Sequence, residues 1–116
     1  MQVPGGVVKQ VLLQNAATGT GNGTTVAPID TANGAWTWLT CQVYGITTAT
    51  ITWEATVDGT HWVAFGMTAT SDGSTVATTA TADGIFRGVV VGYNNVRARI
   101  SAHTTGTITV TGVLTS

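Results

Sequence analysis

TITWEATVDGTHWVAF, residues 50–65, contains two runs of alternating side chains on either side of an Asp-Gly pair. In residues 50–57 apolar and polar side chains alternate with the period of a β-strand, which predicts one dry face and one polar face. The predicted dry face carries Ile51, Trp53, Ala55 and Val57, and the polar face carries Thr50, Thr52, Glu54 and Thr56. Because Asp58 and Gly59 favour a tight turn and alternation resumes over residues 61–67, the stretch predicts a β-hairpin.

Similar turn signals recur through the chain. They are Asn22-Gly23, Asn33-Gly34, Asp72-Gly73, Asp83-Gly84 and Asn94-Asn95. The runs between them are rich in Thr and Val, whose branched side chains favour strands over helices. The sequence therefore predicts an all-β fold, an antiparallel β-sandwich of jelly-roll-like or immunoglobulin-like form with roughly eight strands.

Three further segments have the pattern of strands. Residues 96–101 and 107–114 alternate as half-buried antiparallel strands do. In AWTWLTCQVY, residues 35–44, both faces are apolar enough to need cover, and Trp36 and Trp38 are expected on the same face. A second sheet on one side and a neighbouring subunit on the other would cover such a strand.

The first 23 residues differ from the rest of the chain. VVKQVLL, residues 7–13, favours a strand, whereas NAATGTGNG, residues 15–23, consists of small and flexible residues. We therefore expect residues 1–23 to form an N-terminal arm or edge strand with a flexible loop. Residues 24–116 are expected to form the β-sandwich domain.

Charged side chains are scarce in this chain of 116 residues. They make up 8% of it, against about 25% in an average soluble protein, and the formal net charge is −1. A surface with so few charges gives little repulsion between molecules. We infer that other molecules cover much of this surface, either copies of the same chain or a larger assembly.

The same composition argues against several classes of partner. Four Lys and Arg residues are too few for the basic stripe that nucleic-acid binding needs. The apolar runs are shorter than the roughly 18 residues of a membrane-spanning segment, and the chain does not start with the pattern of a secretory signal. A single cysteine, Cys41, fits folding in a reducing cytoplasm. We expect no nucleic-acid partner and no membrane partner.

The ionisable residues do not form a catalytic or metal-binding motif. Three of the five acidic residues precede a glycine in a predicted turn, where a carboxylate caps local backbone N–H groups. The two histidines, His61 and His103, are far apart in the sequence from each other and from Cys41, unlike the ligands of a zinc motif. We therefore expect no catalytic residues, no metal and no cofactor, and the chain is not expected to be an enzyme.

Two segments resemble small β-sandwich virion proteins encoded by tailed phages and prophages. Residues 51–65 carry a strand followed by Asp-Gly-x-x-Trp in a hairpin, at Asp58, Gly59 and Trp62. Residues 83–114 carry Gly-aromatic-Arg, Gly-Tyr, Val-Arg-x-Arg and Gly-Thr-x-Thr-Val in this order. These positions are Gly84, Phe86 and Arg87; Gly92 and Tyr93; Val96, Arg97 and Arg99; and Gly106, Thr107, Thr109 and Val110.

This resemblance implies a structural protein, most often of the capsid decoration or head-associated type. Such a protein would be made in the host cytoplasm, bind the major capsid protein and copies of itself on the capsid surface, and stabilise the shell. The residues expected at its interfaces are Val7, Val8, Val11, Leu12, Trp36, Trp38, Arg97 and Arg99.

Two alternatives remain open from the sequence. The hairpin is also similar to the Ser-x-Asp-Gly-x-x-Trp hairpin of galactose-binding jelly rolls, with Thr56 at the Ser position, which suggests a carbohydrate-binding or host-attachment module. Trp62, or the pair Trp36 and Trp38, would then form the stacking surface for a sugar. The second alternative is a tail-tube or baseplate component.

Overall fold

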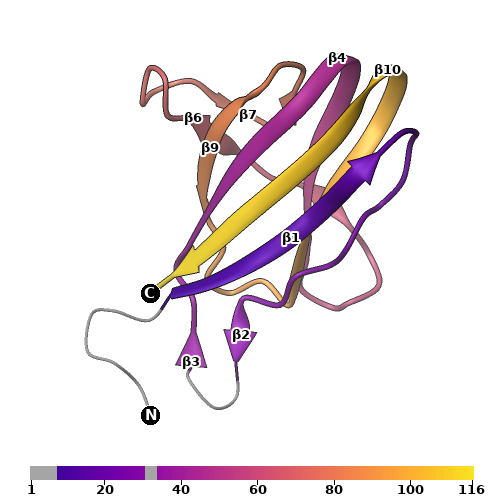
Figure 1. The fold of residues 1–116 in the computed structure, drawn as a ribbon. Coiled ribbons are helices and arrows are strands. Elements are labelled where there is room, and N and C mark those ends of the chain that lie inside the picture. Colours follow the sequence, from indigo (N-terminus) through magenta and orange to yellow (C-terminus); the bar gives the residue numbers. More distant parts are fainter. Residues whose placement is uncertain (1–7, 31–33) are drawn as a thin grey trace.

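The computed structural model describes residues 8–30 and 34–116, and within them the chain forms ten strands and no helix (Figure 1). The strands are β1 (Val8–Ala17), β2 (Ile29–Asp30), β3 (Gly34–Ala35), β4 (Trp38–Thr56), β5 (Val63–Ala64), β6 (Met67–Ala69), β7 (Val76–Ala77), β8 (Thr79–Ala80), β9 (Gly84–Val89) and β10 (Asn95–Thr115). Every strand pairing is antiparallel. The prediction of an all-β antiparallel fold is confirmed. No described segment is a helix long and apolar enough to cross a membrane.

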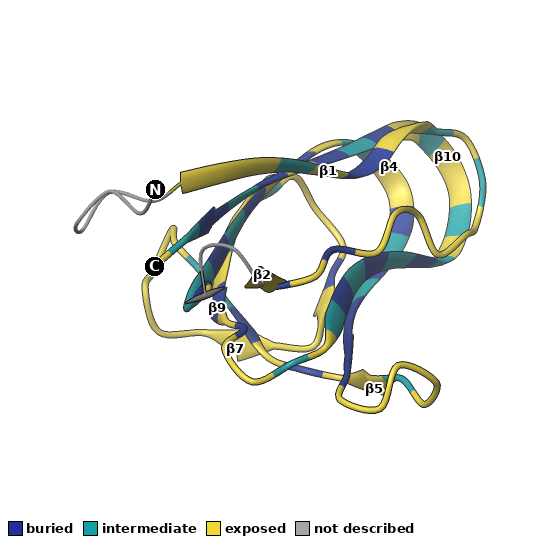
Figure 2. Ribbon diagram, turned by 90° about the horizontal axis from the view of Figure 1, so that it is seen from below, coloured by how far each residue is buried: buried dark blue, intermediate teal, exposed yellow. Residues whose placement is uncertain are grey.

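Eight of these strands form one sheet that folds back on itself. Its order is β1-β10-β4-β9-β6-β7, with β5 and β8 pairing along β4, while β2 and β3 form a separate ribbon. β4 and β10 are 19 and 21 residues long, and both turn at the same end of the molecule (Figure 1). The N-terminal half of β4, the C-terminal half of β10, β1 and β9 form a first layer. The other halves of β4 and β10, with β5 and β8, form a second layer (Figure 2).

Two glycines mark the bend between the layers. Gly45 has φ +95° and Gly106 has φ +118°, a region that residues with a β-carbon rarely adopt. The pairing register of β4 and β10 slips at this point, between the pairs Gly106–Ile46 and Thr109–Tyr44. Asp83 Oδ1 accepts a hydrogen bond from the Ile46 backbone N–H at 2.8 Å. The Asp83 carboxylate therefore caps the bend of β4, and the expectation that it caps its own turn is wrong.

The core lies between the two layers. Trp53 of the second layer is completely buried, and its ring centroid is 5.6 Å from that of Phe86 in the first layer. The predicted dry face of residues 50–57 is buried except for Val57, which is 71% exposed because β4 ends at Thr56 and the turn follows. The largest fully buried side chains are Trp53, Leu13, Leu39, Ile51, Met67, Ile100, Ile108, Leu114, Val43, Val90, Val96 and Val110.

The predicted strand over residues 35–44 is interrupted. The Trp36 N–H donates to the Pro28 carbonyl and the Thr37 N–H to the Thr115 carbonyl, which keeps both residues out of β4. As a result Trp36 turns into the core and is 4% exposed, while Trp38 at the start of β4 is only half-buried. The expectation that the two tryptophans share one face is wrong. Residues 96–101 and 107–114 both lie in strands as expected, but in the single strand β10.

β1 lies at one edge of the sheet. It pairs with the C-terminal half of β10, and its Leu13 side chain is buried in the core. The chain that follows runs beside the N-terminal half of β10, with bridges from Gly21 to Ile100 and from Val26 to Val96. Residues 8–30 thus contribute to both layers.

Asp58 and Asp72 hold their turns as the sequence predicts. Asp58 Oδ1 accepts hydrogen bonds from the N–H groups of Thr60 and His61, each at 2.8 Å. The N–H groups of His61 and Thr60, with the His61 side chain, hold the pKa of Asp58 well below its ordinary value. The Thr75 side chain, with backbone donors, lowers the pKa of Asp72 to about 2. Both carboxylates therefore remain ionised at neutral pH.

Cys41 of β4 points into the core, and its burial raises the pKa of the thiol to about 12. Because the thiolate is the reactive form, we expect native Cys41 to react with a thiol reagent at least about 100-fold more slowly than the unfolded chain does. The rate of reaction with 5,5′-dithiobis(2-nitrobenzoate), with and without urea, measures this. The control is Cys41→Ala combined with Gln42→Cys, since Gln42 is exposed on the other face of β4 and its replacement should react at once. Rapid stoichiometric labelling of native Cys41 would contradict the prediction.

Candidate interaction surface

The first layer has a broad face that points away from the core. Along β4, the inward-facing Leu39, Cys41 and Val43 are buried, so the side chains between them point outward. The same alternation holds in β9 and in the C-terminal half of β10, and the register of β1 on β10 places Val8, Gln10 and Leu12 on the same side. We call this surface the outer face. It consists of Val8, Gln10, Leu12, Trp38, Thr40, Gln42, Tyr44, Ile85, Arg87, Val89, Thr109, Thr111, Val113 and Thr115.

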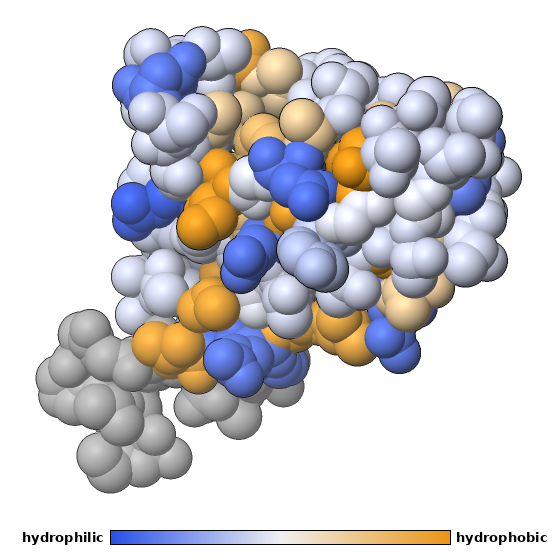
Figure 3. All heavy atoms as spheres, turned by 45° about the horizontal axis from the view of Figure 1, so that its top comes forward, coloured by the Kyte–Doolittle hydropathy of each residue, from blue (hydrophilic) through white to orange (hydrophobic). Residues whose placement is uncertain are grey.

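The outer face is half apolar by residue type and contains one charged residue, Arg87, among its described residues. Its most exposed apolar side chains, between 42% and 69% exposed, are Val8, Leu12, Tyr44, Ile85 and Val89. Threonine and glutamine side chains fill most of the space between them. In Figure 3, orange apolar groups lie among pale residues of intermediate hydropathy and several blue, hydrophilic ones. Exposed apolar and aromatic side chains with few charges around them are typical of a protein contact site.

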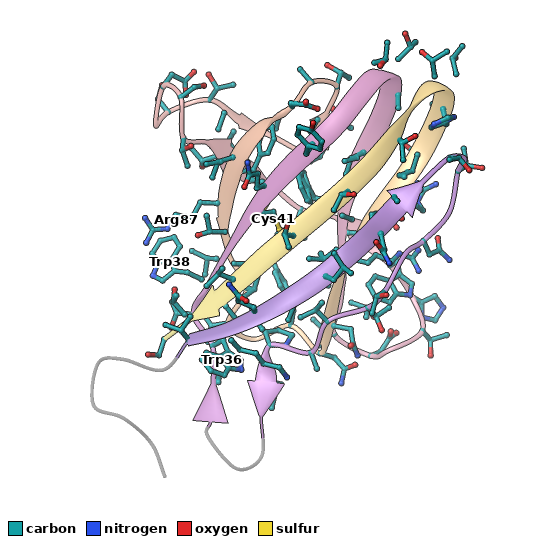
Figure 4. The ribbon with its side chains drawn as sticks, viewed as in Figure 1. Trp36, Trp38, Cys41 and Arg87 are labelled. Carbon is teal, nitrogen blue, oxygen red and sulfur yellow. The ribbon has the colours of Figure 1, made fainter. Side chains whose placement is uncertain are left out.

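Arg87 and Trp38 form a pair at the β9 side of the outer face. The Arg87 guanidinium carbon lies 4.7 Å from the centre of the Trp38 ring, and Figure 4 shows the two side chains next to each other. They line a pocket of about 370 Å³ together with Thr68, Thr70 and Gly73. Arg87 makes no salt bridge with a carboxylate of a described residue. We call this hollow the Trp38–Arg87 pocket.

The predicted interface residues do not gather on one surface. Val8, Leu12 and Trp38 lie on the outer face, whereas Val11 packs partly against the core. Trp36 is a core residue, and Val7 lies outside the described residues. The structure adds outer-face residues from β4, β9 and β10 that the sequence prediction missed, among them all three from β9. The alternation of Ile85, Arg87 and Val89 after a turn was the signal that could have identified them.

Arg97 and Arg99 lie in the second layer, around Glu54. Glu54 Oε1 accepts a hydrogen bond from Arg97 Nε at 2.8 Å and forms a salt bridge with Arg99 Nε at 3.1 Å. Glu54 is 8% exposed and Thr56, two residues further along β4, is 2% exposed. The prediction that the polar face of residues 50–57 is exposed to solvent is therefore wrong for both. Trp62 accounts for part of this burial, because Arg97 lies 4.0 Å from the centre of its ring.

The hairpin end carries a second hollow, of about 350 Å³. Its walls are mainly apolar and include Val57, Val63, Phe65 and Tyr93. At its rim, His61 Nδ1 lies 2.7 Å from Asp58 Oδ2. Trp62, the candidate for sugar stacking, has one ring face occupied by the Arg97 guanidinium, so a sugar could stack only on the opposite face. In residues 8–30 and 34–116, no three or more His, Cys, Asp or Glu side chains are grouped so that they could hold a metal ion.

Comparison with known proteins shows the fold and leaves the family open. No protein-family model matches the chain, and no curated protein sequence matches it. Among solved structures, the SPBc2 prophage-derived protein YomS superposes with a TM-score of 0.84 at 20% identity, over 95% of this chain and 94% of YomS. The PBSX exported protein XepA gives a TM-score of 0.83 at 17% identity over 93% of this chain. The chain spans 37% of the length of XepA.

Proposed function

We propose that this chain is a structural protein of a phage particle, a capsid decoration protein that binds the outside of the assembled shell through its outer face. The observation that carries the proposal is the outer face itself, which has five well-exposed apolar side chains and one charge among its described residues. The likeness to a prophage-derived protein over nearly the full length of both chains supports a phage origin.

Contacts repeated at every copy would supply the stabilisation of the shell. Burying apolar surface contributes roughly 25 cal/mol per Å², and the loss of rigid-body freedom on association offsets part of this gain. A protein that bridges neighbouring capsid subunits contributes its net gain at every copy around the shell. The partners proposed are therefore the major capsid protein and other copies of this chain, arranged as a homotrimer.

The proposal is tested with particles of the phage that encodes the chain, produced without its gene. Purified protein is added, the particles are sedimented, and bound protein is quantified and located by electron microscopy. Saturable binding to the head, with a higher temperature of particle disruption, supports the proposal. Binding only to the tail would favour the tail or baseplate function, and the absence of any binding would overturn the proposal.

Val89→Asp is expected to reduce the binding to particles at least about tenfold, because a carboxylate on the outer face would be buried at the contact. Val89 lies opposite Trp38 in the β4–β9 ladder and is 47% exposed. Val57→Asp is the matched control, since it adds the same charge at an exposed valine at the hairpin end. Equal binding of the two variants in the sedimentation assay would exclude the outer face as the contact surface.

A further inference from the structure

We propose that the Trp38–Arg87 pocket receives a carboxylate side chain from the protein surface on which the outer face docks. The inference rests on the proposed function only for the identity of that surface. The chemistry of the pocket can be tested without a particle.

The pocket holds its cation in a fixed place. Arg87 stands between Thr40 of β4 and Thr68 of β6 in the sheet register, so its backbone is paired on both sides. Its guanidinium carbon lies over the indole of Trp38, 4.7 Å from the ring centre. This cation–π contact holds the side chain and leaves guanidinium N–H groups able to donate to a ligand. Less side-chain freedom is then lost when a partner binds.

The partner must bring a negative charge to this point. The two arginines of the second layer share the Glu54 carboxylate, whereas Arg87 has no salt bridge to a carboxylate of the described chain. A partner that covered the outer face would remove Arg87 from water, and an unpaired buried cation is strongly unfavourable. A carboxylate that accepts two parallel hydrogen bonds from the guanidinium offsets this loss.

The surroundings of Arg87 favour a protein carboxylate over other anions. Trp38, Thr68, Thr70 and Gly73 supply the rest of the lining, and none of them is charged. A polyphosphate or nucleic acid would need several cations close together, and the outer face has one. Tryptophan and arginine side chains are also among the residues that dominate protein–protein contacts.

The test uses the full chain, labelled with ¹⁵N, and two blocked peptides, acetyl-Thr-Ile-Glu-Val-Thr-amide and the same peptide with Gln in place of Glu. We expect the Glu peptide to shift the Arg87 Nε–H and Trp38 indole signals in a saturable way. The Gln peptide should bind at least about tenfold more weakly. Arg87→Gln should abolish the response to the Glu peptide, while Lys9→Gln, which removes the same charge from exposed β1, should leave it unchanged.

Three results would overturn the inference. They are equal shifts with both peptides, a response of Arg87→Gln like that of the unchanged chain, and no shift at roughly 10 mM Glu peptide, where even a weak specific site is partly filled. Shifts of Trp38 with a neutral sugar, such as galactose, and none with the Glu peptide would instead identify a glycan platform.

The particle assay separates this inference from the proposed function. If the unchanged chain binds particles and Arg87→Gln binds equally well, the carboxylate site is wrong and the outer face stands. If the unchanged chain does not bind particles, the proposed function fails, and the peptide titration still decides whether the pocket takes a carboxylate. A loss of at least about tenfold in binding for Arg87→Gln, with Lys9→Gln unaffected, supports both.

Discussion

Gly45→Ala is expected to lower the free energy of unfolding by about 3–5 kcal/mol, a large share of the roughly 5–15 kcal/mol that stabilises a typical domain. A β-carbon built on Gly45 would overlap the backbone carbonyl oxygen of Thr107, which cannot move aside as a side-chain end can. The backbone of Gly45, at φ +95°, is also one that alanine adopts only with strain.

The control for this prediction is Gly19→Ala. A β-carbon built on Gly19 meets no other atom within 4 Å, and its backbone is not in the positive-φ region. Urea denaturation of both variants, followed by tryptophan fluorescence, gives the two free energies. Gly106→Ala should behave like Gly45→Ala, because its β-carbon would lie 2.5 Å from the Gly45 carbonyl oxygen. If Gly45→Ala and Gly19→Ala lose similar amounts of stability, the bend does not depend on glycine.

This bend is also the main feature of the fold that the sequence did not reveal. Alternation correctly predicts which residues of β4 and β10 face the core on either side of it, among them Leu39, Ile51 and Ile100. Residues 44–50 and 101–107 are rich in Thr, Ser and Gly, which are equally typical of a loop between two strands, and Ala49 alone among them is buried. The bend depends on one carbonyl approaching a glycine across the sheet, and such a contact leaves no local pattern.

The interaction surface could be predicted in part. Exposed apolar side chains of β1 and β4 can be inferred from alternation, and Val8, Leu12 and Trp38 do lie on the outer face. The face on which Trp36 lies could not be predicted. Hydrogen bonds from the N–H groups of Trp36 and Thr37 to the carbonyls of Pro28 and Thr115 interrupt the strand and turn Trp36 into the core. Trp38 in β4 and Arg87 in β9 are almost 50 residues apart in the sequence. They meet because of the register in which these two strands pair, which the sequence does not show.

The burial of Glu54 likewise depends on contacts distant in sequence. Alternation places Glu54 on the polar face of β4, but the pairing of β4 with β10 puts Arg97 directly opposite it. Trp62 then covers Arg97 from the hairpin loop. An ion pair that is partly shielded from water contributes more than an exposed one, and removing one partner leaves the others without compensation.

Glu54→Ala is therefore expected to lower the free energy of unfolding by about 2–4 kcal/mol. It leaves Arg97, whose side chain is 14% exposed, next to Arg99 without a carboxylate partner. Glu54→Gln should lose less, since it keeps an acceptor for one hydrogen bond. Thermal and urea unfolding at pH 7 measure both losses. Thr81→Ala, at an exposed site outside the ion-pair cluster, is the control and should lose little.

The pH dependence identifies the ion pair as the cause. Burial by itself would raise the pKa of Glu54, but hydrogen bonds from Arg99 and Arg97 and their charges outweigh it and hold the pKa below its ordinary value of 4.5. Because the pKa of Glu54 is lower in the folded chain than in the unfolded chain, its ion pairs stabilise the fold fully above the ordinary pKa. This stabilisation is lost as the pH falls through the pKa of the folded state. The stability difference between the unchanged chain and Glu54→Gln should therefore be constant near pH 7 and shrink below about pH 4.5. Asp58 and Asp72 titrate in both proteins and cancel from the difference, so a difference that stays constant down to pH 2 would show that the Glu54 charge contributes nothing.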